Sequence, residues 1–149
     1  MALLQAKLTH PDYGLTIMDA KGHTLKIDIP ADQGGHGDGL RPMQTVLAAL
    51  CGCSAVDVIS ILKKQRQPLS DLVIKVDGER QKGVEPSLWE KVHLLFQITG
   101  DVEPGKASRA VQLSIEKYCS VAETLRRAGA TLTWEVMVNE TVVTSYGTT

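Results

Sequence analysis

The sequence predicts an α+β domain, because apolar periodicities typical of strands and of helices follow one another along it. Two segments have helical character, residues 42–65 and 106–128, and alternating apolar residues predict strands before, between and after them. Of the 149 residues, 43% are hydrophobic and 22% are charged. This length and composition indicate one globular domain over residues 1–149, with enough apolar surface to form a core.

The N-terminal part of the chain predicts strands joined by turns. Its apolar residues alternate with polar or small neighbours, at Leu15, Ile17, Leu25, Ile27 and Ile29. Between these two runs, Gly22 lies in a stretch with turn composition and is free to adopt a positive φ. The glycine-rich residues 34–39 predict a loop, because glycine loses too much entropy in regular structure.

A long helix is predicted from Pro42 to about Gln65. Proline favours the first position of a helix, and Pro68 cannot continue one. Apolar residues occupy nearly every side of this helix, including Val46, Leu47, Leu50, Val56, Val58, Ile59, Ile61 and Leu62. A helix that is apolar all round is buried all round, so we expect a sheet on one face and a partner subunit on another.

The second half of the chain predicts two strands, a helix and a final strand. Strict alternation marks strands at 72–80 and 89–99. The helix at 106–128 has apolar residues at spacings of three and four, namely Val111, Ile115, Tyr118, Ala122 and Leu125. Gly129 follows at the position that commonly ends a helix, and alternation resumes in residues 132–138.

Charge and cysteine content exclude several classes of function. The net charge of −1 gives no indication of nucleic-acid or anionic-membrane binding. The N-terminus lacks the basic region of a signal peptide, and polar residues interrupt the apolar runs before spanning length. We therefore expect a cytoplasmic protein with no membrane partner. Its three cysteines would be reduced there, so a disulfide would be transient and catalytic.

Cys53 and Cys119 lie in the two predicted helices, 66 residues apart, and the chain has no CxxC motif. This arrangement suits a pair of reacting thiols better than a metal site, although buried cysteines also serve as small core residues. Cys51 is about 200° around the helix from Cys53 and is interpreted as packing. Four residues neighbour Cys53 one helical turn away. Ala49, Leu50 and Val56 are apolar and Asp57 is acidic, a setting that disfavours a thiolate.

Histidines and glycines give weaker signals. His36 in the glycine-rich loop is either a solvated turn residue or a ligand or base. GGHGDG does not match the dinucleotide-binding fingerprint, which requires GxGxxG between a strand and a helix. The residues therefore predict neither a cofactor nor a metal site.

Three segments together resemble the OsmC/Ohr family of thiol-dependent hydroperoxide reductases: PMQTVLAALCGCSAVDVISILKK, DGERQKGVEPSLWEKVHLLFQITG and EKYCSVAETL. The resemblance implies that Cys53 is the peroxidatic cysteine and Cys119 the resolving one. It also implies an intertwined homodimer in which antiparallel sheets pack on a long central helix and a second helix. The implied substrate is an organic hydroperoxide, and the implied reductant is a dithiol such as a lipoylated protein.

The sequence departs from the best-understood branch of that family in the residues that activate the thiolate. That branch uses an N-terminal arginine and a glutamate just after the helix-opening proline. Here no arginine precedes Arg41, and the neutral Gln44 stands near the glutamate position. Arg41, Gln44 and Arg80 are therefore the candidate activating or supporting residues.

The sequence thus predicts a cytoplasmic, homodimeric thiol peroxidase without a cofactor. Cys53 would form a sulfenic acid that Cys119 converts to a disulfide. The alternative is a protein of the same fold that binds a small ligand or senses redox state without peroxidase activity, which the missing arginine and glutamate favour. A thiolate of low pKa would distinguish the peroxidase from this alternative.

Overall fold

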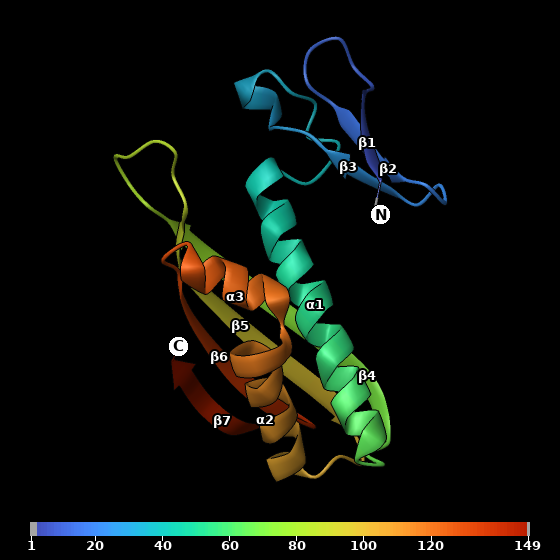
Figure 1. Cartoon of the computed structure of the whole chain (residues 1–149), viewed down its shortest axis with the longest axis vertical. Helices are drawn as coiled ribbons and strands as arrows, with labels where there is room; N and C mark the ends of the chain where they lie inside the picture. The colour runs from blue at the N-terminus through green and yellow to red at the C-terminus, as the bar shows by residue number, and fades with distance from the viewer. Residues whose placement is uncertain (1–2, 149) are drawn as a thin grey trace. The chain divides into compact units, whose positions relative to one another are not determined.

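The computed structural model describes residues 3–148, and the side chains of residues 3–144. Its contacts divide the chain into two compact units, residues 1–46 and 47–149. The fold is α+β, as predicted, with two sheets and three α-helices (Figure 1).

The first unit is built on a three-stranded antiparallel sheet of β1 (Leu4–Leu8), β2 (Leu15–Asp19) and β3 (Thr24–Ile27). Gly22 turns the chain between β2 and β3 with a φ of 89°, as the sequence predicts. The glycine-rich loop follows the short 3₁₀ helix η1 (Ala31–Gln33). Among described residues 3–46, no apolar side chain larger than glycine is buried, so this sheet has no hydrophobic core within its own unit.

One polar residue, Asp28, organises the glycine-rich loop of the first unit. Its side chain accepts hydrogen bonds from the backbone N–H groups of Ile29, His36 and Asp38, at 2.8, 3.1 and 3.2 Å. Burial opposes ionisation of Asp28, but these donors and nearby His36 leave its pKa lowered overall. The His36 ring stacks on His10, with centroids 4.2 Å apart.

The helix predicted to begin at Pro42 is α1 (Pro42–Lys64). Its buried residues recur every three or four positions along one face: Leu47, Leu50, Ser54, Val58 and Leu62. Val56 is 65% exposed and Ile59 44% exposed. Within a single chain, one face of α1 is therefore buried, and other positions of the helix remain exposed. Coverage of the other face by a partner subunit stays a prediction.

The second unit contains a four-stranded sheet in the order β4–β5–β6–β7. The strands are β4 (Leu69–Arg80), β5 (Trp89–Gly100), β6 (Thr131–Val138) and β7 (Thr141–Thr148). The sequence did not predict β7. One pair also departs from the expected antiparallel arrangement, because β5 and β6 run parallel. The chain between them crosses over through the helices, which is what a parallel pair requires.

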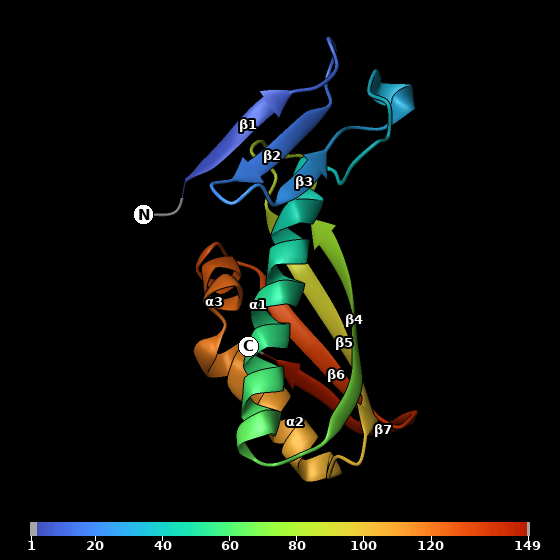
Figure 2. The same cartoon turned by 90° about the vertical axis from the view of Figure 1, so that its right-hand side faces the viewer.

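The hydrophobic core of the second unit lies on one face of this sheet. Alternate residues of the two central strands point into it and are at most 5% exposed: Val92, Leu94, Phe96, Ile98, Leu132, Trp134, Val136 and Val138. Residues 47–64 of α1 and the later helices cover the same face (Figure 2). The strand period of two therefore provides the apolar side that the helices pack against.

The second predicted helix is not continuous. It consists of α2 (Pro104–Leu113), a π-helical turn η2 (Ser114–Tyr118) and α3 (Ser120–Arg127). Cys119 has extended dihedral angles, with φ −73° and ψ 104°, so the helical path ends and restarts there. Neither proline nor glycine stands at this break, which is why helical spacing alone did not reveal it. Gly129 ends α3 with a φ of 99°, as predicted.

By length and composition, α1 could also cross a membrane, contrary to the argument made from interrupted apolar runs. Of its most apolar 18-residue stretch, 28% is buried within the chain. The core helix of a soluble protein passes the same test, so this property alone assigns α1 no role in a membrane.

Candidate active site

The two predicted redox cysteines meet between α1 and the turn before α3. The sulfur atoms of Cys53 and Cys119 and a carboxylate oxygen of Asp57 all lie within 4.8 Å of one another. Cys53 and Asp57 are four residues apart on α1 and therefore share a face of that helix. Cys53 and Asp57 are half-buried, whereas Cys119 is 2% exposed.

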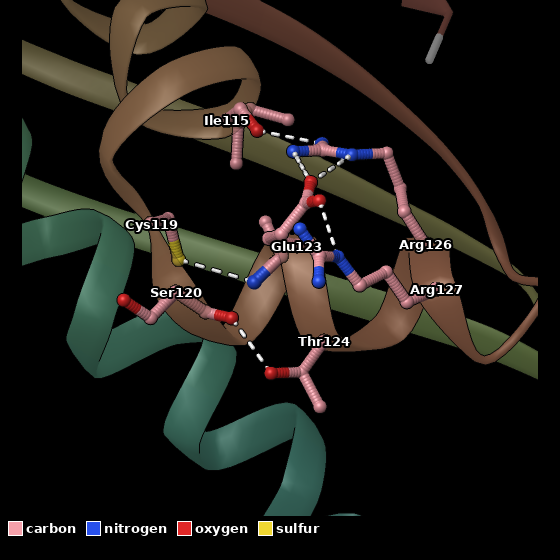
Figure 3. Close-up of polar contacts among 8 residues, drawn as sticks. Ile115, Cys119, Ser120, Glu123, Thr124, Arg126 and Arg127 are labelled. Atoms are coloured by element: carbon pink, nitrogen blue, oxygen red, sulfur yellow. Dashed lines mark hydrogen bonds and ion pairs between the residues drawn. The ribbon is translucent and has the colours of Figure 1, made fainter.

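Local backbone geometry positions Cys119. In the π-turn, the Cys119 N–H donates to the Ser114 carbonyl five residues earlier, at 2.8 Å. Cys119 is then the N-cap of α3, and its sulfur accepts a hydrogen bond from the Ala122 N–H at 3.4 Å (Figure 3). The thiol thus takes the place that serine or aspartate usually occupies at a helix start.

Side chains of α3 stabilise the same turn. Arg126 donates to the Ile115 carbonyl at 2.7 Å and also pairs with Glu123 at 3.0 Å (Figure 3). Arg127 pairs with the other carboxylate oxygen of Glu123, at 2.8 Å. The hydrogen bond from Arg127, followed by that from Arg126, lowers the pKa of Glu123. Arg126 therefore ties α3 to a carbonyl group that the helix break leaves without its helical partner.

Electrostatics disfavour the Cys119 thiolate. Burial raises the pKa of Cys119, and neighbouring Cys53 adds to the effect, so that the pKa reaches about 12 despite the Ala122 donor. Cys119 is consequently a protonated thiol at neutral pH while the pair is reduced. A protonated thiol is a poor nucleophile, so Cys119 needs a proton acceptor in order to react in this state.

Asp57 is held in place by a buried serine from the other side of the site. The Ser114 hydroxyl donates to the Asp57 carboxylate at 3.0 Å, and its oxygen also lies 3.4 Å from the Ser54 carbonyl. Ser114 is fully buried at the start of the π-turn. This contact links α1 to the segment that carries Cys119.

A surface pocket of about 490 Å³ opens beside this cluster. It is lined by Asp57, Ser60, Ile61, Lys64, Gln65, Leu113 and Tyr118. The pocket is thus lined by apolar side chains, by the Lys64 ammonium group and by the Asp57 carboxylate. The pocket meets the cluster of thiols at Asp57.

The candidate activating residues have other hydrogen bonds within their own segments. The Gln44 side chain accepts from the Arg41 N–H at 2.9 Å, which caps the first turn of α1. The Arg80 guanidinium donates twice to the Ser87 carbonyl, at 2.7 and 3.3 Å, across the β4–β5 hairpin. Their part in activating Cys53 stays a prediction. Cys51 is half-buried on α1, and burial raises the pKa of its thiol, in keeping with a packing role.

Sequence reasoning treated Asp57 as an unfavourable neighbour of Cys53 and did not single out Ser114. The four-residue spacing between Cys53 and Asp57 could have indicated that Asp57 belongs to the site. The buried hydroxyl of Ser114 gave no signal, because its partner is 57 residues away in the chain. The three donor atoms of Cys53, Asp57 and Cys119 are fewer than the four protein ligands of a structural zinc site but match the number in catalytic zinc sites.

The OsmC-like protein family model matches residues 35–135, which include both cysteines and Asp57. Protein YhfA of Escherichia coli K12 is 44% identical over 119 residues, covering 77% of this chain and 84% of that protein. A hypothetical protein of Aquifex aeolicus has a similar crystal structure, with 30% identity and a TM-score of 0.76, covering 94% of this chain and 98% of that one.

A more distant structure shares the fold. The organic hydroperoxide resistance protein OhrB of Bacillus subtilis superimposes with a TM-score of 0.63 at 19% identity, over 93% of this chain and 98% of that one. At least one hydroperoxide resistance protein thus has this fold, whereas YhfA is more similar to this chain in sequence. The match over residues 35–135 and the identity to YhfA show that the chain belongs to the OsmC-like protein family.

Proposed function

We propose that this protein reduces organic hydroperoxides with Cys53 as the peroxidatic and Cys119 as the resolving cysteine. The observation that carries the proposal is the meeting of the two sulfur atoms, within 4.8 Å, from segments that are far apart in the sequence. A disulfide would require these side chains to rotate until the two sulfurs are about 2.05 Å apart. The nearby pocket, with Ile61, Leu113 and Tyr118, suits a substrate with an organic tail.

The reaction has two chemical steps before reduction. The Cys53 thiolate attacks the distal peroxide oxygen, the O–O bond breaks, and Cys53 becomes a sulfenic acid while the alcohol leaves. The sulfur of Cys119 then attacks that of Cys53, and water leaves as the disulfide forms. An external dithiol, for which a lipoylated protein is our candidate, returns both cysteines to thiols by exchange.

The proposed assembly is a cytoplasmic homodimer. The first unit has no buried apolar core among its described residues, and α1 leaves Val56 and Ile59 exposed. Exposed apolar surface of this kind is typical of subunit interfaces. A partner subunit would cover these surfaces and could bring Arg41 or another cation to Cys53.

Limiting organic hydroperoxide tests the role of each cysteine. We expect one equivalent of cumene hydroperoxide to give an intrachain Cys53–Cys119 disulfide with Cys51 free, as mapped by mass spectrometry. Cys53→Ser should abolish peroxide consumption, whereas Cys51→Ser should retain it and serves as the control. A bridge that contains Cys51, or a sulfinic acid at Cys53 with Cys119 unchanged, would contradict these roles. A Cys53 that peroxide does not oxidise would favour the ligand-binding alternative.

A further inference from the structure

Asp57 is the one acidic side chain gathered with the two thiols in the described part of the chain. A carboxylate oxygen of Asp57 lies within 4.8 Å of both sulfurs, a separation that a single bridging water or a side-chain rotation spans. Ser114 fixes the carboxylate by donating to one of its oxygens at 3.0 Å. Asp57 also borders the surface pocket, so the carboxylate reaches solvent on its other side.

Disulfide formation requires one proton to leave the Cys119 thiol and one proton to reach the departing oxygen of Cys53. Cys119 must lose its proton to attack, yet its thiol is buried and its pKa is raised to about 12. The oxygen that leaves Cys53 departs as hydroxide unless it receives a proton. One group that accepts the first proton and delivers the second would assist both halves of the step.

We propose that Asp57 is the proton-transfer residue of the disulfide-forming step, an inference that rests on the proposed function. Its carboxylate takes the proton from the Cys119 thiol as the Cys119 sulfur attacks the sulfenic sulfur of Cys53. The S–S bond forms, the S–O bond of the sulfenic acid breaks, and the carboxylic acid protonates the departing hydroxide. The products are the disulfide, one water molecule and the original carboxylate, so the proton balance closes without another reagent.

Other titratable groups near the carboxylate are less suited to this role. Lys64 and Tyr118 line the same pocket as Asp57. A lysine ammonium group has no acceptor lone pair, and a tyrosine hydroxyl is a much weaker base than a carboxylate. Glu123, the acidic residue of α3, is engaged with Arg126 and Arg127. The geometry therefore selects Asp57.

Two rates distinguish the role of Asp57. In Asp57→Asn, cumene hydroperoxide should still oxidise Cys53, because the proposed proton transfer belongs to the later disulfide-forming step. The following disulfide step should slow by about 100-fold at pH 7, the lower end of general acid–base effects. Stopped-flow mixing with dimedone trapping of the sulfenic acid resolves these steps, in a Cys51→Ser background that leaves two thiols.

The pH profile distinguishes proton transfer from mere support of the fold. Without the carboxylate, disulfide formation depends on the small fraction of Cys119 that has already lost its proton. The rate of disulfide formation in Asp57→Asn should therefore rise about tenfold per pH unit between pH 6 and 9. The parent protein should show a much flatter profile. Asp57→Glu, which keeps a carboxylate, should recover part of the rate. Asparagine still accepts from Ser114, so the hydrogen bond that links the two segments is retained in the variant.

A second measurement tests Asp57 without any peroxide. Cys53 is converted to its mixed disulfide with thionitrobenzoate, and attack by Cys119 releases the yellow thionitrobenzoate anion. Release should slow at least tenfold in Asp57→Asn and steepen with pH in the same way. Equal release rates and equal pH profiles in the two proteins would overturn the role of Asp57. Asp57-dependent release combined with no peroxide oxidation would uphold it while rejecting the proposed peroxidase function.

Discussion

Cys119 differs from the other cysteines because it combines near-complete burial with a neighbouring thiol. These features raise its pKa to about 12, and removal of Cys53 should lower it, since Cys53 opposes the thiolate. We expect iodoacetamide to label Cys119 slowly at pH 7–9 in the reduced, folded protein, with labelling rising as pH approaches 12. Mass spectrometry of Cys53→Ser should show this rise at lower pH. Fast labelling of Cys119 at pH 7 in the parent protein would refute its assignment as the protonated, resolving thiol.

Asp28 gives the first unit a predictable dependence on pH. Because its pKa is lowered in the folded protein, its contribution to stability is present above about pH 4 and is lost as pH falls through the lower, folded-state pKa. We expect hydrogen exchange of residues 34–39 to accelerate below pH 4. Asp28→Asn should show fast exchange there already at pH 7, because it has one acceptor oxygen for three backbone donors. The exposed Asp12→Asn serves as a control and should leave the profile unchanged.

At the scale of elements, apolar periodicity predicted what depends on local pattern. The helix starting at Pro42, the strands around Leu94 and Val76, and the turn at Gly22 follow from spacing and from proline and glycine. The parallel pairing of β5 with β6 and the helix break at Cys119 did not, because both depend on contacts between distant segments.

The candidate site shows the same division. The sequence indicated Cys53 and Cys119 through a family resemblance, and their approach is a tertiary property that spacing does not encode. Ser114 escaped notice because a serine within a helix is unremarkable until its distant carboxylate partner is known. Functional π-turns are hard to recognise from sequence for a similar reason, since their extra residue leaves the apolar stripe nearly intact.

The break between α2 and α3 should depend on Arg126 far more than on Arg127. Both arginines pair with Glu123, and Arg126 also donates to the Ile115 carbonyl. We expect Arg126→Leu to speed hydrogen exchange in residues 115–122 by about tenfold and to slow disulfide formation. Arg127→Leu, whose side chain is 80% exposed, is the matched control and should change either rate little. Equal effects of the two changes would show that the Ile115 contact is unimportant.

At the scale of the whole molecule, we expect the apolar residues of α1 to form part of the core of the second unit and part of a subunit interface. Two valines of α1 allow these roles to be tested separately. Val58 is fully buried in the second unit, while Val56 is 65% exposed. If the exposed face contacts a second subunit, Val56→Asp should place a charge in that interface and shift the protein from about 32 kDa, twice 16.1 kDa, toward 16.1 kDa. Sedimentation equilibrium at micromolar concentration measures this change.

Val58→Ala provides the contrasting result for the same experiment. It removes two buried carbon atoms from the core, so it should lower the free energy of unfolding by about 2 kcal/mol without dissociating the subunits. Urea unfolding followed by circular dichroism gives the first quantity and sedimentation the second. A parent protein that sediments as a folded monomer would rule out the dimer. In that case the apolar surfaces of β1–β3 and of α1 would need a different partner, because 46 residues with no buried apolar side chain among those described cannot form a stable unit by themselves.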